Sequence, residues 1–211
     1  MNLDTIHTID IVPVDLNCLL LHLEETLAGI YTLKSDKENA EIFRDKYVER
    51  KQAILKYLWN EDDKMFADYD FIRNGSTGIA TAAMAYPLFF KMVAPYQAEA
   101  TAYSLENKFL NPGGVVTTLV TSGQQWDAPN GWAPLQWIAY KGVMNYGFNE
   151  LANKIKLNWI SNVERVFKQT GKLTEKYNVV NLSLNAGGGE YPNQDGFGWT
   201  NGVYLRLKCE K

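Results

Sequence analysis

The chain has 211 residues with an ordinary globular composition, 46% hydrophobic and 21% charged, which excludes global disorder and fits one domain or at most two small ones. A net charge of −3 argues against a nucleic-acid-binding protein, which needs a basic face, and does not favour an anionic membrane surface. The two cysteines and two histidines cannot form a disulfide framework or a zinc cluster of recognised spacing, so no metal site is expected.

Apolar residues at helical spacing predict a succession of amphipathic helices along the chain. The first is expected to begin at the capping residue Asp15, and the third to be kinked or reset at Pro87. A short extended piece is expected at 66–71. The predicted helices cover residues 15–31, 37–58, 78–94, 96–110, 132–146, 148–169 and 199–208. The sequence therefore predicts an all-α fold of αα-hairpins in a single domain, 1–211, with no dividing linker.

The beginning of the chain, MNLDTIHTID, carries acidic residues where a signal peptide needs a basic start. No run approaches the roughly 20 apolar residues of a membrane span. As written, the sequence predicts a soluble, cytoplasmic chain. It leaves open whether a longer parent protein is periplasmic or secreted.

Two long segments without periodicity, 111–131 and 171–198, separate the predicted helices, and such segments in a compact domain are usually functional. Both are rich in amides, carboxylates and indoles. These side chains are Gln124, Gln125, Trp126, Asp127, Asn130 and Trp132 around the first segment, and Glu175, Glu190, Asp195 and Trp199 in the second. Amides and carboxylates bind sugar hydroxyls, indole faces stack on pyranose rings, and glycoside hydrolysis needs a carboxylate pair. The same residue types also serve as caps, turns and core, so composition alone leaves a structural role open.

Three stretches carry a family resemblance. Residues 124–134, QQWDAPNGWAP, resemble the second signature of the family 37 trehalases. GGGEYP at 187–192 and DGFGWTNGV at 195–203 resemble their C-terminal signature, and DIVPVDLN at 10–17 resembles a further segment. The resemblance covers the whole chain. It implies an (α/α)6 toroid of twelve helices, and hydrolysis of α,α-trehalose to two glucose molecules with inversion and without a cofactor.

The resemblance also implies roles for individual residues. Glu175, in the segment TEKY, matches the family's general base. Glu190, after three glycines, matches a substrate-contacting glutamate, and the tryptophans of the first segment match the wall of the sugar pocket. The substrate-binding set implied in this way is Glu190, Trp126, Trp132, Gln125, Asp127 and Asn130.

The sequence departs from the family pattern in what it lacks. It predicts about seven helices rather than twelve, and holds neither the PGGRF-like first signature nor the ESGWDFSSRW-like segment that carries the general-acid Asp. The arginines of the family's sugar site are also absent. The chain thus resembles the C-terminal half of the toroid, an incomplete catalytic domain. We expect it to be nearly inactive alone, because one general acid contributes about 10²–10⁴-fold.

Half a toroid leaves apolar helix faces without partners, and such faces favour association. The partners expected are trehalose or a related sugar, and either an N-terminal trehalase half or a second copy of the chain, with no nucleic acid and no membrane. Two alternatives stay open. In one, Asp127 or Glu190 acts as the acid opposite Glu175 and the chain is active alone. In the other, the chain is a non-catalytic carbohydrate-binding or interaction protein that keeps the Trp-lined surface.

Overall fold

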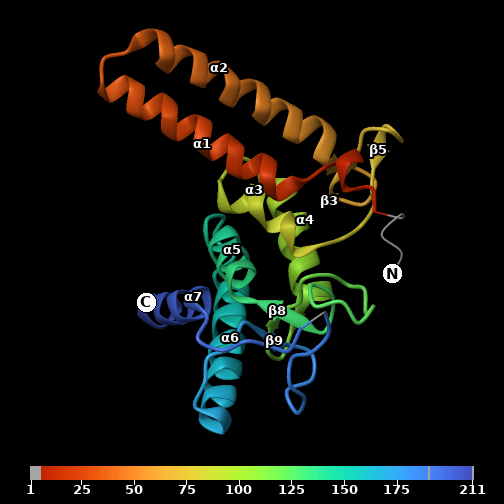
Figure 1. Cartoon of the computed structure of the whole chain (residues 1–211). Helices are drawn as coiled ribbons and strands as arrows, with labels where there is room; N and C mark the ends of the chain where they lie inside the picture. Colours follow the sequence, from red (N-terminus) through yellow and green to blue (C-terminus); the bar gives the residue numbers. More distant parts are fainter. Residues whose placement is uncertain (1–5, 190, 211) are drawn as a thin grey trace. The chain divides into compact units, whose positions relative to one another are not determined.

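The computed structural model describes residues 6–189 and 191–210, and the chain forms two compact units, 1–79 and 80–211 (Figure 1). Its helical character confirms the predicted all-α class. The α-helices of the described residues are α1 (Val14–Leu33), α2 (Lys37–Ala53), α3 (Tyr86–Phe89), α4 (Pro95–Ser104), α5 (Ala133–Met144), α6 (Asn149–Thr170) and α7 (Gly198–Cys209). The single domain expected over 1–211 stays a prediction.

Shorter helical turns and strands join these helices. Within residues 6–189 and 191–210 the turns are the 3-10 helices η2 (Thr8–Asp10) and η4 (Ala82–Ala85), and the π-helical turns η3 (Ile54–Leu58) and η5 (Leu105–Phe109). The strands of the described residues have two or three residues each and pair antiparallel. They are β1 (Ile11–Val12), β2 (Trp59–Asn60), β3 (Met65–Phe66), β4 (Tyr69–Asp70), β5 (Gly75–Ser76), β6 (Leu110–Asn111), β7 (Gly114–Val115), β8 (Asn130–Trp132) and β9 (Lys176–Asn178).

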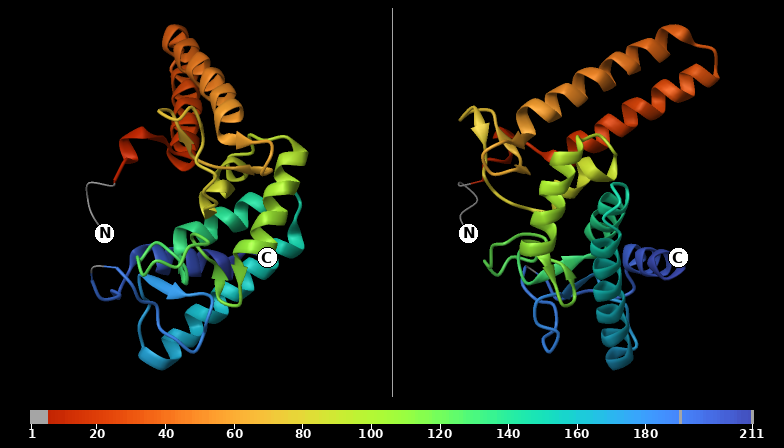
Figure 2. Two further views of the ribbon diagram at one scale, coloured as in Figure 1. Left: turned by 90° about the vertical axis from the view of Figure 1, so that its right-hand side faces the viewer. Right: turned by 180° about the vertical axis from the view of Figure 1, so that it is seen from behind.

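The first unit is built on a helical hairpin, in which α1 and α2 run side by side in opposite directions (Figure 2). The expected cap at Asp15 is wrong, because α1 begins at Val14 and Asp15 lies inside its first turn. The Val14 N–H is capped instead by Asp68, whose Oδ1 accepts it at 2.9 Å. Asp68 lies far along the chain, so local capping rules do not reveal it.

Three short strands, in the order β1–β4–β5, close the base of this hairpin. The predicted helix 37–58 is α2 followed by the π-helical turn η3, which buries Ile54 and Leu58. The expected extended piece at 66–71 contains β4 and the end of β3. Among the residues described, no helix combines the length and the apolar character that crossing a membrane requires.

The second unit packs α5 against α3, α6 and α7. The helix predicted at 78–94 is wrong, because the structure has only η4 and the four-residue α3 there. The Ala82 N–H donates to the carbonyl of Thr117 at 2.8 Å, and not to a carbonyl four residues earlier as in an α-helix. Pro87 lies in the first turn of α3, where its missing N–H does no harm. Tertiary pairing therefore overrides the Ala-rich helical pattern.

The two long segments expected to be irregular are joined by a short antiparallel ladder between β8 and β9. Gly131 lies at its centre, and a Cβ added there would come within 2.5 Å of Val179 Cγ1. The buried Gln136 of α5 holds strand β7 beside the ladder. Its side-chain amide accepts from the Val115 N–H and donates to the Val115 carbonyl, both at 2.7 Å. The close backbone approach at Gly131, which only glycine permits, and the two hydrogen bonds of Gln136 together fix where the two segments meet.

Candidate functional site

The β8–β9 ladder places the candidate site residues of the two segments side by side. Its register pairs Asn130 with Asn178, and Trp132 with Lys176. Glu175 immediately precedes β9, and its backbone is held on both sides. Its N–H donates to Gln194 O at 2.8 Å, and its carbonyl accepts the indole N–H of Trp199 at 3.1 Å.

The Glu175 carboxylate is buried, with 3% of the residue exposed. The Tyr191 hydroxyl donates to its Oε1 at 3.0 Å, and the ammonium of Lys176 donates to its Oε2 at 3.3 Å. A buried carboxylate needs such partners, since its desolvation is otherwise costly. Both oxygens are therefore held in a fixed orientation. A carboxylate fixed in this way can serve as a general base toward a water molecule.

Lys176 is the site residue that sequence reasoning missed. Its side chain is fully buried, and besides Glu175 it donates to Gln125 Oε1 at 3.3 Å. Its ammonium also lies over two rings, 5.5 Å from the centre of Trp132 and 5.2 Å from that of Tyr191. The one clue to Lys176 in the sequence is its position directly after Glu175 in TEKY. Successive side chains of a strand point to opposite faces, so this position argues against a contact between the two residues.

The tryptophans form one aromatic cluster. Trp126 stacks on Trp132, with ring centres 3.8 Å apart and planes 5° from parallel, and Trp199 meets Trp132 edge-on at 5.7 Å. Trp132 is buried, whereas Trp126 is 47% exposed. The Trp132 indole N–H donates to the Gln125 carbonyl at 3.2 Å. Trp126 therefore offers an aromatic surface to solvent, and Trp132 supports it from beneath.

Asn130 joins the first segment to the glycines of the second. It is 1% exposed, and its amide nitrogen donates to Gly187 O at 2.7 Å and to Gln125 O at 3.2 Å. Its Oδ1 is buried and has no hydrogen-bond partner among the described residues. The backbone contact is extended by Gly189, whose N–H donates to Gly123 O at 2.9 Å with φ at +84°. Glu190, which follows, lies outside the described residues.

The other two acids of the segments are engaged with their own neighbours. Asp127 accepts a hydrogen bond from the Thr118 hydroxyl at 2.9 Å and another from Ser122. Asp195 pairs with Lys172, and hydrogen bonding from that ammonium lowers the pKa of Asp195. Among the residues that the structure describes, no group of three or more His, Cys, Asp and Glu is placed to hold a metal ion.

A family model described as Trehalase matches residues 1–208. The periplasmic trehalase of Salmonella paratyphi B is 46% identical over 205 residues, and that of Salmonella agona is 45% identical. Each alignment covers 97% of this chain and 36% of the relative. The chain thus spans about a third of the length of these relatives.

The fold is similar to that of neutral trehalase Nth1 from Saccharomyces cerevisiae, with a TM-score of 0.79 and 24% identity over 94% of this chain and 38% of that one. It is also similar to a family 63 mannosylglycerate hydrolase from Thermus thermophilus, with a TM-score of 0.72 and 21% identity over 93% of this chain and 47% of that one. At these identities the likeness concerns the fold alone. It confirms the expected relation to part of an (α/α)6 toroid.

Proposed function

The chain belongs to the trehalase family, and from this premise we propose that its two site-forming segments build one side of a trehalose-hydrolysing site. One observation carries the proposal: the Glu175 carboxylate is buried, held at both oxygens, and lies in the same residue cluster as the exposed Trp126 stack. A fixed carboxylate beside a sugar-stacking surface is the arrangement that glycoside hydrolysis uses.

In this proposal Glu175 is the general base of an inverting reaction. It takes a proton from a water molecule as the water attacks the anomeric carbon, while a second carboxylic acid donates its proton to the leaving glycosidic oxygen. The two carboxyl groups of an inverting enzyme lie roughly 6.5–9.5 Å apart. The sequence in hand contains no ESGWDFSSRW-like acid segment. We therefore propose that the chain alone hydrolyses trehalose very slowly, and that an N-terminal trehalase half supplies the acid.

The other candidate residues of the sugar site have roles in the same proposal. Trp126 stacks on a glucose ring. Gln125 and Asn130, which are hydrogen-bonded to each other next to Trp132, orient the sugar hydroxyls. Asp127 acts by holding its own segment, because Thr118 and Ser122 already engage its carboxylate. Glu190 is proposed as a substrate contact on the family resemblance.

The test is glucose release from α,α-trehalose, followed by proton NMR. The chain alone should release no more glucose than Glu175→Gln. When an N-terminal trehalase half carrying the acid segment is added, α- and β-glucose should appear in equal amounts at early times, and Glu175→Gln should abolish both. Glu164→Gln, whose carboxylate on α6 pairs with Tyr204 and Lys208, is the matched control. Equal release by wild type and Glu175→Gln in the mixture would refute the assignment of the base.

The exposed Trp126 surface favours a second function, a carbohydrate-binding protein without turnover. Trehalose should then quench tryptophan fluorescence while NMR detects no glucose, both alone and with the N-terminal half. Trp126→Ala should remove the quenching. Trp137→Ala, on helix α5 and outside the first segment, should keep it. Absence of any spectral change at about 1 mM, the concentration range of weak binding, would exclude this reading.

We further propose that the N-terminal trehalase half covers an apolar face of α1. Large apolar side chains spaced by three, four and seven residues are exposed on this helix, which is the spacing of a helix–helix seam. They are Leu16, Leu19, Leu23, Ile30 and Leu33. Light scattering should show a one-to-one complex that Leu19→Glu weakens and that Leu205→Glu, a change of an exposed side chain on α7, leaves intact. A dimer of the chain that excludes the N-terminal half would instead identify a second copy as the partner.

A further inference from the structure

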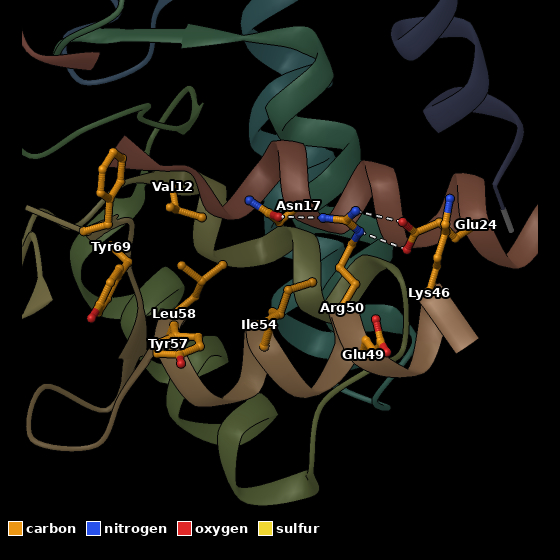
Figure 3. Close-up of a pocket in the computed structure, with 12 residues that line it drawn as sticks. Val12, Asn17, Glu24, Lys46, Glu49, Arg50, Ile54, Tyr57, Leu58 and Tyr69 are labelled. Atoms are coloured by element: carbon orange, nitrogen blue, oxygen red, sulfur yellow. Dashed lines mark hydrogen bonds and ion pairs between the residues drawn. The ribbon is translucent and has the colours of Figure 1, made fainter. Parts of the chain in front are cut away.

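A cavity lies within the first unit, between α1, α2 and strand β4, and none of the residues of the two site-forming segments lines it (Figure 3). Its volume is about 560 Å³, which falls in the size range of small-molecule sites, roughly 300–1,000 Å³. Its lining changes in character from one end to the other. One end holds charged groups and an amide, and the other holds aromatic rings.

The polar end is organised by Arg50. Its Nε and Nη2 donate to the two oxygens of Glu24 at 2.9 and 2.7 Å, and its Nη1 donates to Asn17 Oδ1 at 3.0 Å, as the dashed lines in Figure 3 show. Glu24 is buried, whereas the Arg50 side chain is 29% exposed. A guanidinium has five N–H groups, so these bonds within the described residues leave two for another acceptor. Replacing a buried pair by apolar groups is often neutral for stability, so the Arg50–Glu24 pair is weak evidence of a stabilising role.

The apolar end is a set of rings on a buried aliphatic floor. Tyr57 and Phe71 are 43% and 51% exposed, and the ring of Tyr69 meets that of Tyr57 at 5.3 Å with a 60° tilt. Ile54 and Leu58 form the floor beneath them. Half-exposed aromatic faces gathered at a cavity mark a binding surface more often than isolated exposed rings do.

The charges of the lining specify the ligand further. Glu24 and Glu49 are balanced by Lys46 and Arg50, so the lining has a formal net charge of zero. A site for a phosphate, a carboxylate or a cation would carry an excess of the opposite charge. A neutral ligand with hydroxyl groups at one end and an apolar ring face at the other fits the lining better.

We propose that this cavity binds a neutral sugar of one or two rings, separately from the site around Glu175. The C–H face of one ring lies on Tyr57 and Phe71, and hydroxyls donate to Glu24 and accept from the unused N–H groups of Arg50. Hydrogen bonds in which one partner is ionised are shorter and stronger than neutral ones, so a charged donor beside a charged acceptor suits a hydroxyl, which both donates and accepts. The proposal holds whether or not Glu175 is a general base, because the two sites share no residue.

The test uses Trp126→Ala, which removes the exposed indole of the other site, with isotope-labelled tyrosine as the NMR probe. Glucose and trehalose, added in steps to well above 1 mM, should shift the Tyr57 and Tyr69 ring signals with a saturable curve. Adding Tyr57→Ala should weaken the affinity about tenfold, equivalent to about 1.4 kcal/mol, whereas Tyr57→Phe keeps the ring and should bind within about twofold. Tyr103→Ala, on an exposed residue of α4, is the matched control.

Two outcomes would overturn the proposal. One is that neither sugar moves the two tyrosine signals in a protein whose spectrum shows it to be folded. The other is that Tyr57→Ala binds as tightly as Tyr57→Phe. The first outcome, together with sugar binding by the protein that keeps Trp126, would place all sugar binding in the other site, and would leave the proposed function standing while this cavity is excluded.

Discussion

Lys176 and Trp132 face each other across the β8–β9 ladder, and the ammonium of Lys176 lies 5.5 Å from the centre of the Trp132 ring. Because Lys176 also donates to Glu175, one buried cation connects the aromatic cluster of the first segment to the carboxylate of the second.

Lys176→Met should destabilise the protein strongly. The change leaves the Glu175 carboxylate buried without its cation, and breaking a buried pair on one side costs about 3–5 kcal/mol. Urea unfolding followed by circular dichroism measures the difference. Lys172→Met is the control, because Lys172 forms an exposed pair with Asp195 and its loss should change the unfolding midpoint little. Similar midpoints for both variants would show that the buried pair contributes no more than the exposed one.

Gly131→Ala should lower stability by about 1–3 kcal/mol, the usual cost of overpacking. The new Cβ would lie 2.5 Å from Val179 Cγ1 and 2.8 Å from the carbonyl of Val115, and this backbone oxygen cannot easily move. Gly29→Ala in α1 is the matched change, since nothing lies within 4 Å of its Cβ position and alanine favours a helix. It should stabilise the protein slightly. The two variants are compared by thermal unfolding, and equal effects would contradict the tight contact at Gly131.

Asp68→Asn should make the protein more stable at neutral pH. Burial, and secondarily the charge of Asp15, raise the pKa of Asp68 above its ordinary value of 3.8, while the Val14 N–H lowers it. A raised folded-state pKa means that the contribution of this carboxyl to stability is present below its ordinary value and is lost as pH rises through the folded-state value. Asparagine keeps an oxygen for the Val14 N–H without the buried charge.

The measurement for Asp68 is urea unfolding of both proteins at a series of pH values. The stability difference between Asp68→Asn and wild type should be small near pH 3.8, grow as pH rises through the raised pKa, and then level off. Other carboxyls act equally in both proteins and cancel in the difference. A difference that shrinks with rising pH would mean that the charged form of Asp68 is the better cap.

The two cysteines should react very differently with iodoacetamide. Burial, with the nearby charge of Asp15 as a second cause, raises the pKa of the Cys18 thiol to about 12, so almost no thiolate is present at neutral pH. Cys209 is exposed. Mass spectrometry after brief alkylation should find one modification, on Cys209, and two after unfolding in urea. Rapid labelling of Cys18 in the native protein would show that α1 opens away from its neighbours.

The sequence predicts the long helices well and the region around Pro87 poorly. In α6, buried residues recur at helical spacing over six turns, and both ends fall within one residue of the predicted 148–169. At 78–94 the Ala-rich pattern indicates one helix. In the structure the Ala82 N–H pairs with the Thr117 carbonyl, and the short helix α3 begins with Pro87 in its first turn. Long-range pairing of that kind leaves no trace in local periodicity.

The candidate site could be located from the sequence but not assembled. The residue types and the family resemblance indicate Glu175 and Trp126 as members of one site, and the structure brings their segments together. Strands of three residues are too short to show a period of two, so the pairing of Asn130 with Asn178 could not be predicted. Lys176 was missed for the same reason, because its contact with Trp132 depends on the strand register, which the sequence does not show.

The β8–β9 ladder also sets an order of events during synthesis. Trp132 leaves the ribosome before α5 and α6, and its partner Lys176 follows only after both helices. Local helix contacts form quickly, whereas pairings between distant segments wait for the whole intervening chain. Until then the indoles of the first segment have no strand to cover them. These indoles are therefore aggregation-prone surface in the nascent chain until β9 has been synthesised.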